Sequence, residues 1–370
     1  MSETDSTSET GSLLPETEER EEESEVVDPR RRRRRRVVKT LIILSVSVLV
    51  ITLTLAGVVG YYAYKFDHNV KRIPNVFAVV PGEHRPAKPA GKAGKAENFI
   101  LVGTDSRAPT QTTGTGGNPN GVSPIGQRSD TLMLVHLPAD GKAAYLVSIP
   151  RDSWVPIPGH GNDKINAALA FGGPRLLRQT IEQLTGVHVD HYLEVDFAGF
   201  KSMTDAVGGV DVTVPADSYD SANHVQWHAG KQHLDGTTGL QYVRQRYGLA
   251  GGDFDRIKHQ HQFLQALMSK AGSGSLLTDP LSLKNFLQAF TKSISVDSGL
   301  SGAKLLSLAR KLRGLGSGAH YYTVPVTGTG KEGSASVVYL DAAEGPKLWA
   351  AMKSDSLGSY VLPPPLYGPG

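Results

Sequence analysis

The chain has 370 residues, of which 39% are hydrophobic and 20% are charged, and it contains no cysteine. This composition indicates a globular protein of one or two domains, and the lack of cysteine excludes disulfides, thiol catalysis and cysteine metal sites. The formal net charge of +3 is too small to indicate a nucleic-acid-binding protein.

Residues 1–36 are predicted to be a disordered cytoplasmic tail. Residues 1–29 are rich in Ser, Thr and Glu and have few large apolar side chains, a composition that packs no core. Seven arginines follow, from Arg30 to Arg36. Such a run also suits nucleic acid, but immediately beside a membrane span it is better explained by topology and by lipid headgroups.

Residues 37–64 are predicted to form one transmembrane helix that acts as a signal anchor. The stretch Leu41–Gly60 has 20 residues and no charge, which is long enough to cross about 30 Å of hydrocarbon. Tyr61, Tyr62 and Tyr64 follow as interfacial anchors. Because arginines stay on the cytoplasmic side, we expect a single-pass cell-membrane protein whose remainder is extracellular. The alternative is a cleaved signal peptide, which the length of the apolar run disfavours.

After the membrane, the sequence predicts an extracellular linker, a folded domain and a short tail. Residues 65–96 are assigned to the linker because their Pro, Gly, Ala and Lys content is not expected to pack a core. The domain is expected over residues 97–355. The terminal residues 356–370, which end in "VLPPPLYGPG", are expected to be disordered.

Strands and helices alternate along the domain. Apolar runs and turn residues predict strands at 98–103, 130–137, 143–149, 189–195, 210–214, and near 320–326 and 336–340. Amphipathic stretches predict helices at 172–186, 196–209, 238–246, 253–271, and near 280–290, 302–314 and 342–353. This alternation predicts an α/β or α+β fold in which helices cover both faces of a sheet.

Charged residues lie at the ends of three predicted strands, where ligands bind in sheets of this kind. Asp105 and Arg107 follow the first strand, Arg128 and Asp130 open the second, and Arg151 follows the third. If the first two strands are adjacent, Asp105 and Asp130 meet at one edge and suit Mg²⁺. The alternative is that each aspartate caps a turn or pairs with a nearby arginine.

The segment 242–262 gathers further polar residues: Arg244, Arg246, Arg256 and Gln260. Arg256 and Gln260 share one face of a helix, for which Asp253 is a plausible N-cap. Guanidinium is well shaped to grip phosphate through two hydrogen bonds, so the arginines indicate an anion site. The alternative is a structural network in which Asp253 and Asp255 pair with the arginines.

Eight segments, in order, resemble the LytR-CpsA-Psr family of bacterial cell-envelope proteins. They are "NFILVGTDSR" (98–107), "RSDTLMLVHL" (128–137), "LVSIPRDSWVPIPG" (146–159), "KINAALAFGGP" (164–174), "VDHYLEVDFAGF" (189–200), "VGGVDVTVP" (207–215), "LDGTTGLQYVRQRYG" (234–248) and "GGDFDRIKHQHQFLQAL" (251–267). The resemblance implies core motifs over 98–267 in an α-β-α domain, with a mixed central β-sheet flanked by helices.

The resemblance also implies an activity. Members of the family look like Mg²⁺-dependent phosphotransferases that move an anionic glycopolymer, such as a teichoic acid, from a polyprenyl-pyrophosphate carrier to a sugar hydroxyl of peptidoglycan. The new bond is a phosphodiester. Two alternatives remain open: a noncatalytic regulatory or polymer-binding envelope protein, and a hydrolase of the lipid-linked pyrophosphate.

By resemblance, the pyrophosphate-binding positions are Arg151, Arg244, Arg246, Arg256 and Gln260, with Arg107 and Arg128 at the rim. Asp105 and Asp130 match the carboxylates that hold Mg²⁺. The expected catalytic residues are Arg151, Arg244, Arg246, Arg256 and Asp130. A base must also take the proton of the acceptor hydroxyl, and both Asp105 and Asp130 remain candidates for it.

Overall fold

The computed structural model describes residues 67–105, 128–272, 279–313 and 318–363, together with Gly57, Gly60, Tyr61 and Tyr64. The tail predicted at 1–36, most of the membrane helix predicted at 37–64, and Arg107 lie outside these residues. Within the described part, no helix combines the length and the apolar character needed to cross a membrane. The chain divides into two units, Met1–Val59 and Gly60–Gly370, and the fold below is that of the second unit.

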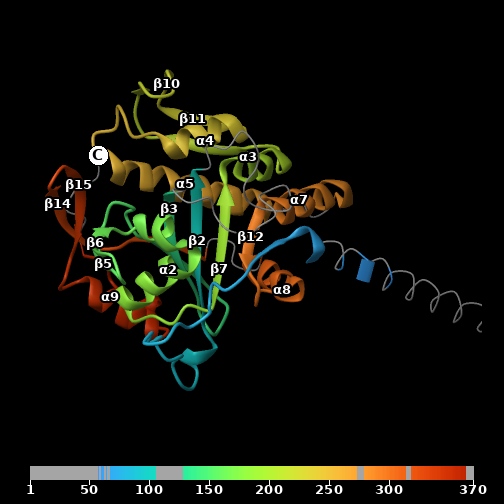
Figure 1. Cartoon of the computed structure of the whole chain (residues 1–370). Helices are drawn as coiled ribbons and strands as arrows, with labels where there is room; N and C mark the ends of the chain where they lie inside the picture. Colours follow the sequence, from blue (N-terminus) through green and yellow to red (C-terminus); the bar gives the residue numbers. More distant parts are fainter. Residues whose placement is uncertain are drawn as a thin grey trace, which may run out of the picture. The chain divides into compact units, whose positions relative to one another are not determined.

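A mixed seven-stranded sheet forms the centre of the domain (Figure 1). Its strands, in spatial order, are β1 (Lys71–Ile73), β12 (Ile294–Asp297), β7 (His191–Asp196), β2 (Glu97–Asp105), β3 (Arg128–Leu137), β4 (Ala144–Ser148) and β13 (Ala319–Thr323). Three neighbouring pairs are parallel and three are antiparallel. The expected mixed sheet is therefore confirmed.

Helices cover both faces of this sheet, because alternate strand residues point to opposite faces. On one face, Ile100 and Val102 of β2 pack with α2 (Ala167–Thr185) and α9 (Gly345–Lys353). On the other, Phe99 of β2 and Met133 of β3 pack in a second apolar cluster with α3 (Phe197–Ala206), α5 (Asp253–Ala271), α7 (Pro280–Ser293) and α8 (Gly302–Arg313). The α-β-α arrangement is confirmed.

A third apolar cluster joins α3, α5 and α4 (Gly236–Arg244) to the antiparallel pair of β8 (Val210–Val214) and β11 (Gly230–Leu234). Three further two-stranded elements complete the strands: β9 (Ser218–Asp220) with β10 (Val225–Trp227), β5 (Trp154–Ile157) with β6 (Gly161–Lys164), and β14 (Val326–Glu332) with β15 (Ala335–Leu340). Two short 3₁₀ turns lie at Ala93–Lys95 and Leu357–Ser359.

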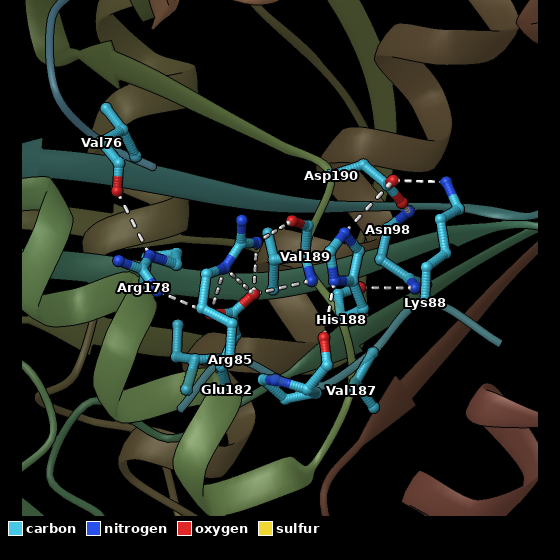
Figure 2. Close-up of polar contacts among 12 residues, drawn as sticks. Val76, Arg85, Lys88, Asn98, Arg178, Glu182, Val187, His188, Val189 and Asp190 are labelled. Atoms are coloured by element: carbon cyan, nitrogen blue, oxygen red, sulfur yellow. Dashed lines mark hydrogen bonds and ion pairs between the residues drawn. The ribbon is translucent and has the colours of Figure 1, made fainter. Parts of the chain in front are cut away.

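The segment expected to be an unpacked linker is folded onto the domain from Asp67 onward. Ile73 and Val76 are buried in the core, and β1 adds an edge strand beside β12. Figure 2 shows the polar contacts that hold the rest. Nη2 of Arg85 lies 2.7 Å from the buried Glu182, which is also 2.7 Å from the fully buried Arg178. Charged partners on α2 thus compensate for the segment's low apolar content.

The C-terminal residues 356–363 also differ from the expected disordered tail. Leu357 is 1% exposed in the core, and Tyr360 lies edge-on to Tyr322 of β13. These two side chains fix the segment because each offers enough apolar surface to pack under α9 and β13.

Candidate functional site

Four strand ends meet at one edge of the central sheet. The last residues of β2, β7 and β4 and the first of β3 lie there, because β2 is parallel to β7 and antiparallel to β3. Asp105 pairs with Arg128 in the backbone register, so the expected adjacency of these two strands is confirmed. The register shifts between Gly103 and Thr104, which leaves Asp130 as the extra residue of a β-bulge. Bulges re-aim side chains near active sites.

Six charged side chains form a continuous chain of ion pairs at this edge: Asp130, Arg151, Asp152, Arg246, Asp253 and Arg256. Arg151 contacts Asp130 directly, and its Nε lies 3.7 Å from Asp152. Asp152 lies 4.0 Å from Nη2 of Arg246. Oδ1 of Asp253 lies 3.3 Å from Nε of Arg246 and 2.7 Å from Nη2 of Arg256. We call Arg151, Arg246 and Arg256 the arginine cluster.

Arg256 is the most buried member of the arginine cluster, with 4% of the residue exposed. Burial is the main cause that lowers the pKa of its guanidinium to about 10; Asp253 opposes this effect, and the positive charges of Arg151 and Arg246 add to it. Arg256 still carries its charge at neutral pH. The fold therefore holds a buried cation beside two others.

The carboxylates do not use all the hydrogen-bonding capacity of these cations. Lys164 of β6 lies 3.1 Å from Asp152, so four cations face the three carboxylates of the ion-pair chain. Nε of Arg151 and Nε of Arg256 are buried and have no hydrogen-bond partner among the described residues. Arg246 keeps 43% of its side chain exposed. An incoming anion therefore finds both uncompensated charge and unused donors.

Arg244 and Gln260 flank the arginine cluster. The guanidinium of Arg244 lies 4.2 Å from the ring centroid of Phe197, the first residue of α3 directly after β7, and so at the same edge of the sheet. Gln260 is 8% exposed and donates from Nε2 to the carbonyl oxygen of Val243 at 3.3 Å. This bond ties the middle of α5 to the last turn of α4, which ends at Arg244.

Two details of α5 differ from the sequence analysis. The N-cap is Gly252 rather than Asp253, because a backbone with φ of 53° at that position favours glycine. Asp253 instead places its carboxylate between Arg246 and Arg256. Asp255, the other expected partner of the arginines, lies 2.9 Å from Lys258 and accepts a hydrogen bond from the backbone of Gly251.

Oxygen atoms suited to a magnesium ion lie at the end of β2 and the start of β3. Thr104 and Ser129 pair across β2 and β3, next to Asp105 and beside the bulged Asp130. Both hydroxyl oxygens are buried and have no hydrogen-bond partner among the described residues. Magnesium prefers hard oxygen ligands and keeps several positions for water or phosphate. The hydroxyl oxygens of Thr104 and Ser129 beside Asp130 therefore fit the ion.

Two charged members of the site, Asp152 and Lys164, were not predicted from the sequence to be site residues. Asp152 bridges Arg151 to Arg246, which are 95 positions apart, so no local pattern indicated it. The available signal was the position of both residues inside segments already singled out, "IPRDSW" and "KINAALAFGGP". Asp253 was weighed only as a cap or as a structural partner.

An incompletely covered apolar surface lies on the α5 side of the sheet. It consists of side chains from central strands: Leu101, Val135, Leu193 and Val195. These residues remain partly exposed although their strands have neighbours on both sides. We call this surface the open apolar face. Leu264 of α5 and Phe290 of α7 pack against it and also stay partly exposed.

Comparisons with known proteins agree with the geometry. The model of the LytR_cpsA_psr family matches residues 63–354. The chain belongs to this family. The probable cell wall biosynthesis protein LcpB of Corynebacterium glutamicum is 38% identical to this chain over 261 residues. The match covers 69% of this chain and 61% of LcpB. The chain thus spans about three fifths of that relative.

Two further relatives carry more specific names. A polyisoprenyl-teichoic acid–peptidoglycan teichoic acid transferase, TagU of Bacillus cereus, is 34% identical over 249 residues, covering 64% of this chain and 73% of TagU. The solved structure of TagT bound to LI-WTA superposes with a TM-score of 0.57 and 26% identity, covering 75% of this chain and 98% of TagT. Family membership and the mixed α/β fold therefore rest on independent comparisons.

Proposed function

We propose that this chain is a phosphotransferase that moves a glycopolymer from a polyprenyl-pyrophosphate carrier to a sugar hydroxyl of peptidoglycan. The observation that carries the proposal is the arginine cluster, in which buried and half-exposed guanidinium groups keep unused donors at one edge of the sheet. The names of TagU and LcpB support a role in attaching polymers to the wall.

In the proposed reaction, the acceptor oxygen bonds to the phosphorus that carries the polymer. The bond from that phosphorus to the bridging oxygen of the pyrophosphate breaks, and polyprenyl phosphate leaves with the electron pair. Such transfers need positioning and charge neutralisation more than covalent help from the protein. Arg256 and Arg151 hold phosphate oxygens from within the site, and the half-exposed Arg246 and Arg244 complete the grip from its rim.

A carboxylate at the strand ends takes the proton of the acceptor hydroxyl. Asp130 and Asp105 are the two candidates. Both also fit as ligands of Mg²⁺, together with the hydroxyl oxygens of Thr104 and Ser129. When bound, the ion would neutralise negative charge on the pyrophosphate. Because Asp130 also contacts Arg151, that arginine holds its carboxylate in place at the bulge.

The open apolar face suits the lipid part of the donor. A polyprenyl chain that covers Leu101, Val135 and Leu193 removes apolar surface from water, at about 25 cal/mol per Å². The predicted anchor at 37–64 would keep the domain outside the cell and at the membrane where the donor resides, so we propose an extracellular, single-pass membrane location.

The test uses full-length protein in detergent, a polyprenyl-pyrophosphate-linked oligosaccharide, soluble peptidoglycan fragments and Mg²⁺. We expect mass spectrometry to detect a phosphodiester-linked adduct that is absent with Arg244→Ala or with EDTA. Free sugar phosphate without an adduct would instead indicate the hydrolase. Tight donor binding without turnover for a series of teichoic-acid-type donors would indicate the noncatalytic binding protein.

A further inference from the structure

A stacked aromatic pair stands exposed beside the candidate site. The rings of His160 and Phe171 lie with centroids 4.6 Å apart and an interplanar angle of 17°. Phe171 is 47% exposed, and His160 is exposed as well. A large apolar ring left in water forgoes the stabilisation that burial would provide, so a ligand that covers it recovers that stabilisation. We call the two rings the aromatic platform.

The backbone on both sides holds the aromatic platform in place. His160 closes a turn in which its N–H donates to the carbonyl of Ile157 at 2.9 Å, with Gly159 at φ of 78°. Phe171 ends the first part of α2, which is interrupted at Gly172 and Gly173 before it resumes at Pro174. Two bends that depend on glycine therefore bring the two rings into contact. Neither His160 nor Phe171 belongs to the core clusters.

One hydrogen bond and one ion pair link the segment between His160 and Phe171 to Arg151 and Asp152. The strand that follows His160, β6, ends at Lys164, which lies 3.1 Å from Asp152. The residue that precedes α2, Asn166, donates its backbone N–H to the carbonyl of Arg151 at 3.2 Å. Since four residue steps lead from His160 along β6 to Lys164, His160 lies roughly 13 Å from the charged end of that strand.

The platform and the open apolar face lie on opposite sides of the sheet. β5 and α2 contribute side chains to the cluster that contains Ile100, and β6 pairs with β5. In contrast, α5 and α7 lie over the face that contains Leu101 and Val135 (Figure 1). Attacking and leaving oxygens are roughly in line in phosphoryl transfer. If polyprenyl phosphate departs toward the open apolar face, the acceptor approaches from the side of the platform.

We infer that the aromatic platform of His160 and Phe171 binds a pyranose ring of the acceptor glycan strand. This inference rests on the proposed function and assigns its acceptor side. The apolar C–H face of a pyranose stacks on an aromatic ring, while its hydroxyl and acetamido groups remain available to polar partners. The ring nitrogens of His160 and the ammonium of Lys164 supply hydrogen bonds along the path to the arginine cluster.

Direct binding tests the inference without requiring turnover. Full-length protein in detergent is titrated with peptide-free glycan strands of peptidoglycan by isothermal calorimetry, and separately with polyprenyl pyrophosphate. We expect Phe171→Ala to weaken glycan binding about five- to tenfold, the loss of one stacking contact, and Phe171→Trp to retain it. Tyr219→Ala removes a ring that is similarly exposed, at 50%, in the β9–β10 hairpin and should change nothing.

The results of these titrations distinguish failure of the glycan-binding inference from failure of the proposed function. If Phe171→Ala raises the acceptor KM without altering donor affinity, the acceptor assignment is supported. Equal glycan affinity in Phe171→Ala and wild type overturns it, and so does a loss of polyprenyl-pyrophosphate binding of the same size. If no variant or wild-type protein transfers polymer, but Phe171→Ala still loses glycan binding, the proposed function fails while the glycan site stands.

Discussion

Asp253 offers the sharpest test of whether the arginine cluster is an anion site or a structural ion-pair network. Its carboxylate is the partner shared by Arg246 and the 4%-exposed Arg256. Breaking a fully buried pair costs about 3–5 kcal/mol. The side chain of Asp253 is 14% exposed, and an uncharged amide of the same size still fills its place. For Asp253→Asn we therefore expect a loss of about 2–3 kcal/mol.

Inorganic pyrophosphate should reverse most of that loss. A ligand present at 100 times its Kd stabilises the native state by about 2.7 kcal/mol, close to the expected cost of Asp253→Asn. The gain should be larger in the variant than in wild type, because the anion no longer competes with the Asp253 carboxylate for Arg246 and Arg256.

The assay is urea unfolding of the full-length protein in detergent, with EDTA present, followed by tryptophan fluorescence. Trp154, Trp227 and Trp349 all lie within the domain. Asp255→Asn is the matched control, since the same change on the same helix removes a pair with the half-exposed Lys258. We expect about 1 kcal/mol from it and no altered response to pyrophosphate. A pyrophosphate effect missing from both Asp253→Asn and wild type would refute the anion site and leave a structural network.

Three further predictions concern the rest of the domain. Arg178→Met leaves Glu182 without a fully buried partner and should destabilise the domain by about 3–5 kcal/mol in urea unfolding. Lys347→Ala removes an exposed pair and should leave the urea midpoint nearly unchanged. Equal shifts of the midpoint would contradict the ion-pair argument. Burial lowers the pKa of His261 in the folded protein to about 4, whereas the same imidazole in the unfolded chain titrates at about 6.5. The unfolded chain therefore takes up this proton first as the pH falls. The free energy of unfolding should decrease by at most about 3 kcal/mol between about pH 6.5 and pH 4. Urea midpoints of His261→Gln should lose this part of the pH dependence, and an unchanged slope would show that other groups cause it. Gly248→Ala introduces a side chain at φ of 75°, and its Cβ would lie 2.3 Å from a backbone carbonyl oxygen. We expect this change to destabilise the domain by about 1–3 kcal/mol and to lower the transfer rate. A variant with wild-type stability would show that the loop relaxes freely.

Long periodic elements were predictable and short paired ones were not. The helix expected at 253–271 forms with those bounds as α5, because its apolar spacing and flanking glycines both define it. By contrast β1, with three residues, and β12, with four, became strands only by pairing with distant partners. Their local sequences carry too few alternations for a period to be detected, and the docking of residues 76–96 likewise depends on α2.

The same distinction holds for the candidate site. Arg151, Arg246 and Arg256 were found because guanidinium groups near strand and helix ends indicate phosphate chemistry. The partners of these arginines were not assigned, since Asp152 connects residues far apart in sequence and Asp253 acquires its role from the conformation of Gly252. The sequence thus indicated which residues are suited to bind an anion, while their carboxylate partners depend on the tertiary structure.

The ion-pair chain also explains how like charges can be gathered before any substrate is present. Arg256 is held with a lowered pKa next to Arg151 and Arg246, a repulsive arrangement that Asp130 and Asp253 offset. The offset is incomplete, because Lys164 adds a fourth cation and two guanidinium nitrogens keep no hydrogen-bond partner among the described residues. A pyrophosphate supplies the missing negative charge, so donor binding and local stability should rise together. Before the donor binds, the carboxylates offset enough of the repulsion to keep the site folded, while the site keeps a net positive charge.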